Sequence, residues 1–373
     1  MSRVLNVAVI GLGIGKAHIA EGYAKHPDKF RVLTLCDLDT KRLAAVGDEF
    51  GVPRRTASFD AVLGMADIDV VDVCTPPALH VPQTLAALAA GKHAICEKPL
   101  AGSLAEVDKL IAAQRKAKCR IMPVFQYRFG NGLQRAKRII ELGLAGKPYL
   151  ATVETAWKRT AAYYAVPWRG KWQTELGGVL VTHAIHSHDI LTYLMGPIAS
   201  VFARTATRVN AIEVEDCAVA SLEMKSGALV SLAATLGSQR EISRLRLCFE
   251  HVTFESSLEP YRPGDDPWAI TPASPEAEAR IAKALEDWRF VPSRYEGLLA
   301  SYHAAIVVDG PLPVTLGDAR QSLELVTALM HSAETGLAVA LPIGKHHAKY
   351  RNWRPRARTA RPRRPGQRAA GRR

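Results

Sequence analysis

Short apolar runs separated by longer segments of helical periodicity dominate the first 124 residues. The apolar runs predict strands at residues 7–10, 32–36, 69–74, 93–96 and 119–124. Helices are predicted at residues 80–90 and from Ser103 onward, where Ser103 and Glu106 have the spacing of a capping box. Regular alternation of strands and helices favours an α/β fold, so residues 1–124 are predicted to form a doubly wound parallel sheet.

The hydrophobic pattern changes after residue 124. A helix is predicted at 132–142, and longer alternating strands at 149–157, 201–208, 217–224, 228–236 and 245–254. This pattern predicts a second α/β domain at residues 125–345, built on a large, open, mostly antiparallel sheet. We expect helices to cover one face of that sheet and a partner subunit to cover the other.

The charge of the chain is concentrated at its C-terminal end. The net charge is +13, but Arg351 to Arg373 contain ten arginines and no acidic residue, so the remainder carries only +3. Residues 346–373 are therefore predicted to be a disordered Arg/Pro-rich tail, which would touch polyanions only weakly. We expect no specific nucleic-acid partner.

Cysteine usage and hydropathy favour a cytoplasmic protein. The six cysteines are scattered and form no C-x-x-C pair, which suits a reducing compartment. The N-terminus does not resemble a signal peptide, and no apolar run approaches the ~18 residues that cross a bilayer. No membrane association is expected.

A glycine-rich segment, VAVIGLGIGKAH, joins the first predicted strand to a helix. Glycines in such a turn let a ligand approach the backbone, and the helix N-terminus favours phosphates. We therefore predict that Gly11, Gly13, Ile14 and Gly15 bind the pyrophosphate of a dinucleotide. The spacing is tighter than G-x-G-x-x-G, because Lys16 occupies the place of the third glycine, and a turn without a ligand is the alternative.

Further polar residues follow the carboxyl ends of the predicted strands, where open α/β sheets bind ligands. Asp37 lies 26 residues after Gly11, at the end of the second strand, and could accept hydrogen bonds from ribose hydroxyls. It would repel a 2′-phosphate and so favours NAD over NADP, although Lys41 and Arg42 could soften that preference. A capping aspartate is the alternative. The other predicted cofactor-binding residues near these ends are Thr75, Pro76, His80 and Glu97.

Lys98 lies between Glu97 and Pro99 at the end of the fifth strand. A cation at this edge could hydrogen-bond a reacting oxygen and lower its pKa. A solvated turn lysine is the alternative.

Two dense segments lie between the strands of the second half. Residues 159–172 include Tyr163, Trp168 and Arg169, which suit a polar, ring-shaped substrate, although the aromatic rings could instead clamp the loop to its own domain. Residues 177–189 read GGVLVTHAIHSHD, and a helix from Val179 would place Thr182, His186 and Asp189 on one face.

Three histidines in the second segment raise the question of a metal site. His183 and His186 would share a helical face, but His188 would not, and no cysteine or carboxylate cluster completes a ligand set, so no metal is expected. Imidazole titrates near neutral pH, which makes His186 a candidate general base or acid. A buried core histidine is the alternative.

These motifs together resemble the glucose-fructose oxidoreductase / inositol dehydrogenase / rhizopine-catabolism (Gfo/Idh/MocA) family. The matching stretches, within residues 4–345, are VAVIGLGIGKAH, VCTPPALH, CEKPL, GGVLVTHAIHSHDILTYLMG, IEVEDCA and SLELVTALMHSAETGLAVALP. The resemblance implies an N-terminal Rossmann domain, a C-terminal α/β domain used in dimer or tetramer contacts, and NAD(P)-dependent chemistry on a sugar, inositol or related polyol.

The resemblance also implies roles for individual residues. Lys98 corresponds to the family's catalytic lysine and His186 to its catalytic histidine, so His186 is expected to take the hydroxyl proton while Lys98 hydrogen-bonds the same oxygen. Substrate contacts are expected from Lys98, Tyr163, Trp168, Arg169, Thr182, His183 and His186. The family often has an aspartate four residues before its histidine, where this chain has Thr182.

Two other functions are compatible with these motifs. Some relatives of this fold retain NAD and hydrolyse glycosides through transient oxidation, and a non-catalytic nucleotide sensor could use the same domains. Tightly retained cofactor without net reduction of added NAD would indicate the hydrolase.

Overall fold

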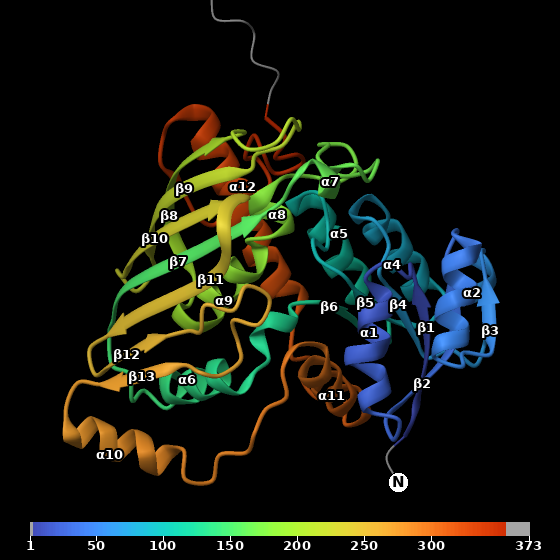
Figure 1. Ribbon diagram of the computed structural model, residues 1–373, viewed down its shortest axis with the longest axis horizontal. Coiled ribbons are helices and arrows are strands. Elements are labelled where there is room, and N and C mark those ends of the chain that lie inside the picture. The colour runs from blue at the N-terminus through green and yellow to red at the C-terminus, as the bar shows by residue number, and fades with distance from the viewer. Residues whose placement is uncertain (1–2, 356–373) are drawn as a thin grey trace, which may run out of the picture.

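The computed structural model describes residues 3–355 and contains two sheets side by side (Figure 1). The N-terminal sheet has six parallel strands in the order β3-β2-β1-β4-β5-β6. Its strands are β1 (Leu5–Ile10), β2 (Phe30–Cys36), β3 (Arg54–Thr56), β4 (Val70–Val73), β5 (His93–Cys96) and β6 (Ile121–Pro123). The order reverses between β1 and β4, which confirms the predicted doubly wound sheet.

Helices pack around this first sheet, and short polar side chains cap several of them. They are α1 (Gly15–Glu21), α2 (Thr40–Glu49), α3 (Phe59–Leu63), α4 (His80–Ala89) and α5 (Leu104–Gln114). The side chains of Asp39, Ser58 and Ser103 accept backbone N–H groups at the starts of α2, α3 and α5. The central strand β4 is wholly buried, including the charged side chain of Asp72.

The second sheet has eight strands in the order β13-β12-β11-β7-β10-β9-β8-β14. They are β7 (Pro148–Lys158), β8 (Ile198–Ala206), β9 (Cys217–Met224), β10 (Leu229–Thr235), β11 (Gly237–Phe249), β12 (Val252–Glu255), β13 (Ala269–Pro272) and β14 (Val339–Ala340). Only the β7–β10 pair of this described sheet is parallel, so the prediction of a mostly antiparallel sheet is confirmed.

The single strand predicted at 245–254 is wrong. The chain turns at Glu250 and His251, and β11 and β12 pair as neighbours. Both strands face the same core, where the rings of Phe249 and Phe254 lie 5.8 Å apart, but the buried positions change from odd-numbered in β11 to even-numbered in β12. This change of phase at the turn is the signal of the hairpin that the prediction overlooked.

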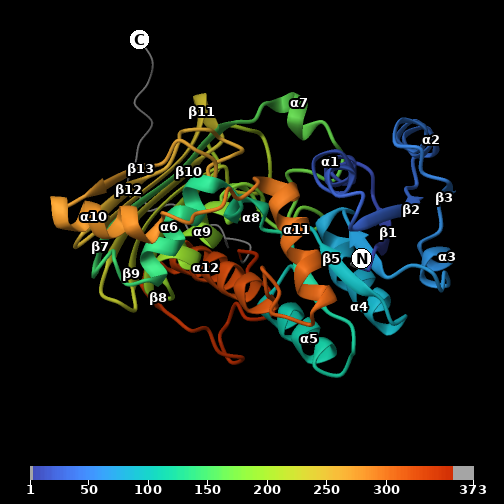
Figure 2. The same cartoon turned by 90° about the horizontal axis from the view of Figure 1, so that it is seen from below.

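Helices cover one face of the second sheet (Figure 2). They include α6 (Asn131–Glu141), α9 (Ile185–Met195) and α12 (Leu316–Thr335), whereas α10 (Pro275–Ala284) lies at the β13 edge. Helix α11 (Arg294–Val307) packs against α1, and α12 packs against α5, so the late part of the chain holds the two sheets together.

The opposite face of the second sheet is open and carries exposed apolar side chains. Val219 and Leu229 are 57% and 58% exposed, and Phe202 lies on the neighbouring strand β8. A helix long and apolar enough for a bilayer does not occur between residues 3 and 355.

The structure corrects the start of the predicted tail at residue 346. Tyr350 and Trp353 are buried, the Trp353 indole Nε1 donates to Leu176 O at 2.7 Å, and the Tyr350 hydroxyl donates to Asp108 at 2.6 Å. The arginine-dense composition concealed these two aromatic anchors. Residues 356–373, which hold most of the predicted tail, lie outside the described residues.

Candidate active site

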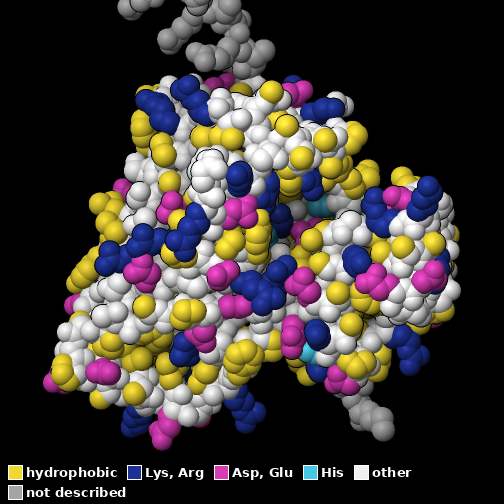
Figure 3. Space-filling model, viewed as in Figure 1, with side chains coloured by type: hydrophobic (Ala, Val, Ile, Leu, Met, Phe, Trp, Pro, Cys, Tyr) yellow, Lys and Arg dark blue, Asp and Glu magenta, His cyan; other side chains and the backbone are white. Residues whose placement is uncertain are grey.

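A cleft of about 1000 Å³ lies between the two sheets and is lined by both halves of the chain. Figure 3 shows it as a hollow with Lys, Arg and His side chains at its walls. The predicted residues that line it are Gly11, Gly13, Ile14, Asp37, Thr75, Pro76, His80, Glu97, Lys98, Tyr163, Trp168, Arg169, Thr182, His183 and His186. Tertiary folding thus brings together motifs that are far apart in the sequence.

The glycine loop forms a cradle at the cleft. Gly11 has a φ of +87°, and a Cβ there would lie 2.7 Å from the Cys74 carbonyl oxygen, so only glycine fits. A Cβ on Gly13 would meet no atom within 4 Å, which leaves its backbone open to a ligand. These two glycines fit a dinucleotide pyrophosphate at the start of α1.

Gly15, by contrast, is not among the cleft-lining residues. A Cβ there would lie 2.8 Å from Val9 Cγ1 and 3.3 Å from Cys74 Cβ. Its missing side chain therefore lets α1 pack closely on β1 and β4. This is the packing role usually given to the third glycine of G-x-G-x-x-G, here performed one residue earlier.

Asp37 is held in place at the cleft edge after β2. Its Oδ2 accepts the Leu12 backbone N–H at 2.7 Å, and its Oδ1 accepts that of Asp39 at 2.8 Å. Arg42 Nη1 contacts Oδ2 at 3.3 Å. The carboxylate can thus face a ribose, and the arginine beside it is placed to reduce the repulsion of a 2′-phosphate.

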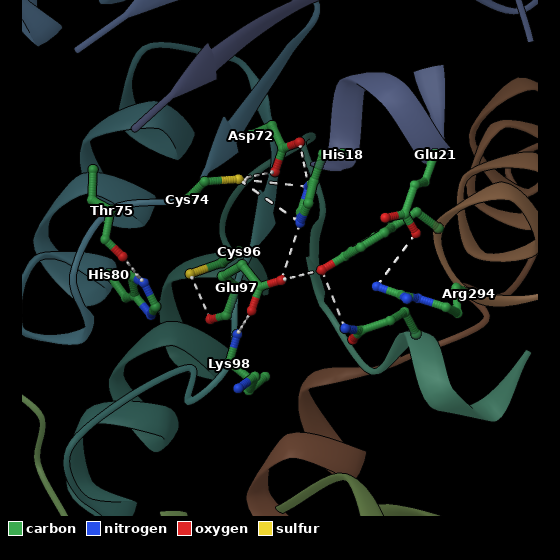
Figure 4. A network of polar contacts seen from close by, with 12 residues as sticks. His18, Glu21, Asp72, Cys74, Thr75, His80, Cys96, Glu97, Lys98 and Arg294 are labelled. Atoms are coloured by element: carbon green, nitrogen blue, oxygen red, sulfur yellow. Dashed lines mark hydrogen bonds and ion pairs between the residues drawn. The ribbon is translucent and has the colours of Figure 1, made fainter. Parts of the chain in front are cut away.

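A buried network that the sequence analysis did not identify lies directly behind Lys98 (Figure 4). His18 lies between two carboxylates, with Nδ1 at 2.8 Å from Asp72 Oδ2 and Nε2 at 3.0 Å from Glu97 Oε1. Burial lowers the pKa of His18, but the surrounding groups, Asp72 foremost, more than offset this and hold the pKa well above its ordinary value. Burial raises the pKa of Glu97, but the hydrogen bond and charge of His18 bring it down to about 2.

This network supports the backbone of Lys98. Tyr295 OH donates to Glu97 Oε1 at 3.2 Å, and Glu97 Oε2 accepts the Lys98 backbone N–H at 2.9 Å. His18 ends the glycine-rich segment itself, but nothing in the local sequence indicated that its ring points inward.

His18, Asp72 and Cys74 are also spaced like metal ligands, with one ligand atom of each within 4.8 Å of the others. Their hydrogen bonds account for this spacing, since Cys74 Sγ donates to Asp72 Oδ1 at 3.4 Å. An imidazole with both nitrogens facing carboxylates is an imidazolium, which has no lone pair for a metal.

The Lys98 ammonium crosses the cleft and contacts the second domain. Its Nζ donates to the Thr182 carbonyl oxygen at 2.7 Å. Burial lowers the pKa of Lys98. The negative charges of Glu97 and Glu175 raise it, but burial together with the positive charges of Arg159 and Arg169 leaves the pKa below its ordinary value. A lysine with a lowered pKa can exchange a proton closer to neutral pH.

The single helix predicted from Val179 is wrong. Helix α8 (Val179–Thr182) ends at His183, and α9 begins at Ile185. Glu215 anchors the start of α8, since its Oε1 accepts the N–H groups of Gly178 and Leu180, both at 3.1 Å. A Cβ on Gly178 would lie 1.7 Å from Glu215 O, so the glycine pair is a packing requirement.

The residues that one helical face was predicted to hold do not all reach the cleft. Thr182 and His186 both reach the cleft, but Asp189 pairs with buried Arg128 through two contacts of 2.6 Å. Asp189 therefore supports the core of the domain. His188 is wholly buried and does not line the cleft, so it is a core histidine.

His186 presents a neutral imidazole to the cleft. Its ring stacks on Tyr127 with centroids 4.1 Å apart, and Nδ1 is buried with no hydrogen-bond partner among the described residues. Burial, reinforced by the Lys98 charge, holds the pKa of His186 well below its ordinary value.

The aromatic loop places cations over rings beside the cleft. The Arg169 guanidinium lies 3.7 Å from the Tyr163 ring centroid and 5.2 Å from that of Trp168. Arg159 lies 5.1 Å from the Trp157 ring and also lines the cleft. Arg159 and Trp157 were not predicted as site residues, although Arg159 begins the same loop.

Comparisons with known proteins agree with this geometry. Residues 5–125 match "Oxidoreductase family, NAD-binding Rossmann fold", and residues 133–255 match "GFO/IDH/MocA C-terminal domain". The chain belongs to the Gfo/Idh/MocA oxidoreductase family. It therefore carries an NAD-binding Rossmann domain, as the glycine cradle and Asp37 independently suggest.

Several relatives act on sugars or cyclic polyols. The 1,5-anhydro-D-fructose reductase of Ensifer adhaerens is 27% identical over 84% of this chain and 92% of its own length. The myo-inositol 2-dehydrogenase of Thermotoga maritima is 31% identical over 60% of this chain and 66% of its own length. Among solved structures, the WlbA dehydrogenase of Bordetella pertussis, in complex with NADH and UDP-GlcNAcA, has a TM-score of 0.80 and 29% identity over 92% of this chain and 99% of its own.

Proposed function

We propose that this protein is an NAD-dependent dehydrogenase that interconverts a hydroxyl and a carbonyl group on a sugar, inositol or related polyol. The observation that carries the proposal is the meeting of Lys98 and His186 in one cleft with the glycine cradle. The sugar-directed relatives support the substrate class.

The nucleotide half of the cleft offers a suitable set of contacts for NAD. Gly11 and Gly13 would face the pyrophosphate, and Asp37 would face the ribose. Thr75 and Pro76 line the same part of the cleft. When bound, NAD supplies the acceptor for a hydride. The Asp37 carboxylate, which is held in place by two backbone N–H groups, favours NAD over NADP. The adjacent Arg42 weakens this preference.

Lys98 and His186 would contact the reacting oxygen of the sugar. The Lys98 ammonium favours the oxyanion that forms as the hydroxyl loses its proton. The neutral His186 imidazole can exchange a proton at the same place. Tyr163, Trp168 and Arg169 would hold the sugar through ring contacts and hydrogen bonds.

The open face of the second sheet supports a homodimer or homotetramer. Exposed Val219 and Leu229 lie on adjacent strands, and a partner subunit would remove them from water. Sedimentation of the purified protein tests this proposal, because a monomer at micromolar concentration would contradict it.

A cytoplasmic location stays a prediction.

The enzymatic proposal is tested by nicotinamide absorbance with NAD or NADP and a panel of inositols, sugars and sugar acids. Lys98→Ala should lower turnover by about 10²-fold or more while NAD binding is kept. Exposed Lys147→Ala is the matched control and should behave as wild type. A fully active Lys98→Ala enzyme would contradict the assignment, whereas bound NAD without turnover of any substrate would favour the hydrolase or the sensor.

A further inference from the structure

The second domain presents two imidazoles to the cleft, His183 and His186, and their surroundings give the two rings opposite hydrogen-bonding character. The difference starts with Thr182. Its hydroxyl donates to the Gly178 carbonyl oxygen at 2.8 Å and lies 2.6 Å from His183 Nδ1. A hydroxyl has one proton, and the Gly178 carbonyl takes it, so in the contact with His183 the Nδ1–H group must donate.

The tautomer of His183 follows from this contact. With the proton on Nδ1, the Nε2 atom of the neutral ring carries a lone pair. Burial first, and then the charges of Arg159 and Lys98, hold the pKa of His183 well below its ordinary value, which keeps the ring neutral. No described residue hydrogen-bonds Nε2, and the ring forms part of the cleft wall. His183 is therefore an oriented proton acceptor.

His186 has the opposite preference. Its Nδ1 is buried without a partner among residues 3–355. A buried N–H without an acceptor is rarer in proteins than an unpaired acceptor, so the proton belongs on Nε2. The Nε2–H group of a neutral His186 donates a hydrogen bond, and in that form it cannot accept the proton of a hydroxyl.

Thr182 also connects His183 to the lysine. Its hydroxyl orients His183, and its carbonyl oxygen accepts the Lys98 ammonium at 2.7 Å. A single residue therefore places both the cation and the acceptor at one wall of the cleft. Thr182 is the last residue of α8, and Glu215 holds the start of that helix.

We propose that His183 is the proton acceptor of the reaction, that Thr182 is the positioning residue that orients it, and that His186 acts as a hydrogen-bond donor to the substrate oxygen. This inference rests on the proposed dehydrogenase function and divides its proton chemistry between two histidines. The substrate O–H bond breaks and an N–H bond forms at His183 Nε2. The C–H bond of the carbon that bears this oxygen breaks as well, and its hydride passes to NAD⁺. The imidazolium so formed keeps its Nδ1–H bond to Thr182.

The tautomers can be measured without substrate or cofactor. Long-range ¹H–¹⁵N spectra of the ¹⁵N-histidine-labelled protein, assigned with His183→Asn and His186→Asn, should show Nε2 unprotonated in His183 and protonated in His186. Thr182→Val should disturb only the His183 pattern, and Thr182→Ser, which keeps the hydroxyl, should restore it. A proton on His183 Nε2, or a Thr182→Val spectrum identical to wild type, would overturn the proposal.

Kinetics with the substrate found in the panel provide the second test. His183→Ala should lower kcat by about 10²-fold with the NAD dissociation constant unchanged, and added imidazole should restore part of the activity. His186→Ala should lose less activity than His183→Ala, because it removes a hydrogen-bond donor and leaves the proton acceptor in place. Rescue confined to His186→Ala, or wild-type kcat in His183→Ala, would return the acceptor role to His186.

These tests separate the two proposals. If the wild-type protein oxidises no member of the panel, the proposed function is contradicted. The tautomers measured by NMR then still decide whether Thr182 and His183 form an oriented pair. An active enzyme with the reverse tautomers keeps the function and refutes the division of roles.

Discussion

The two walls of the cleft are built by different means. The nucleotide wall follows the ends of β1, β2 and β4, and its residues come directly after strands that the hydrophobic pattern identifies. The sugar wall is built from a helix break and a loop, and it depends on residues such as Glu215 that lie elsewhere in the sequence. Chemistry at strand ends is thus readable from local sequence, whereas chemistry at a helix break depends on distant support.

Glu215 allows the strongest test of this contrast. Burial raises the pKa of Glu215 from 4.5 to about 7. A carboxyl group whose pKa is raised in the folded protein stabilises the fold. This contribution to the free energy of unfolding is complete below pH 4.5 and is lost as the pH rises toward 7 and above. The pKa shift of Glu215 corresponds to about 3 kcal/mol of unfolding free energy, because a pKa difference of one unit is worth about 1.4 kcal/mol.

Glu215→Gln should therefore remove this part of the pH dependence. Denaturant unfolding at pH 5 and pH 8 measures it, and the stability lost between these values should be smaller in the variant by up to about 3 kcal/mol. Glu213→Gln, a neighbouring glutamate contacting Trp172, is the control. Identical slopes in wild type and Glu215→Gln would show that Glu215 is not the titrating group.

Gly11→Ala should have the next largest effect, and only on the nucleotide wall. The added Cβ meets the Cys74 carbonyl at a positive φ, which should cost about 1–3 kcal/mol of stability and weaken NAD binding. Thermal unfolding and NAD fluorescence titration measure the two effects. Gly91→Ala is the control, since Gly91 also has a positive φ but a Cβ there would meet no atom within 4 Å. Equal effects in both variants would mean that backbone strain alone is responsible.

Asp37→Ala should have the smallest effect and should act through cofactor choice. Loss of the ribose acceptor should weaken NAD binding by about 10-fold, or about 1.4 kcal/mol. NADP binding should improve, because the Asp37 carboxylate beside Arg42 would no longer repel the 2′-phosphate. Competitive titration with the two cofactors measures the ratio, and an unchanged ratio would show that Asp37 does not read the ribose.

The sequence alone determined the fold class, the doubly wound sheet and fifteen of the residues that line the cleft. Residues such as Asp37 and Lys98 could be predicted because the end of a parallel strand points to a fixed place, the carboxyl edge of the sheet. Period-two and helical patterns report burial along one segment, and burial is what the local sequence encodes most directly.

Only the tertiary structure decided how the side chains face each other. The inward turn of His18 between Asp72 and Glu97, the packing role of Gly15 and the start of α8 on Glu215 each depend on partners distant in sequence. Hydrogen-bond partners set the protonation of a buried imidazole, so His18, His183 and His186 differ although the sequence presents each simply as a histidine. Protonation is a property of the surroundings, and those surroundings exist only in the folded chain.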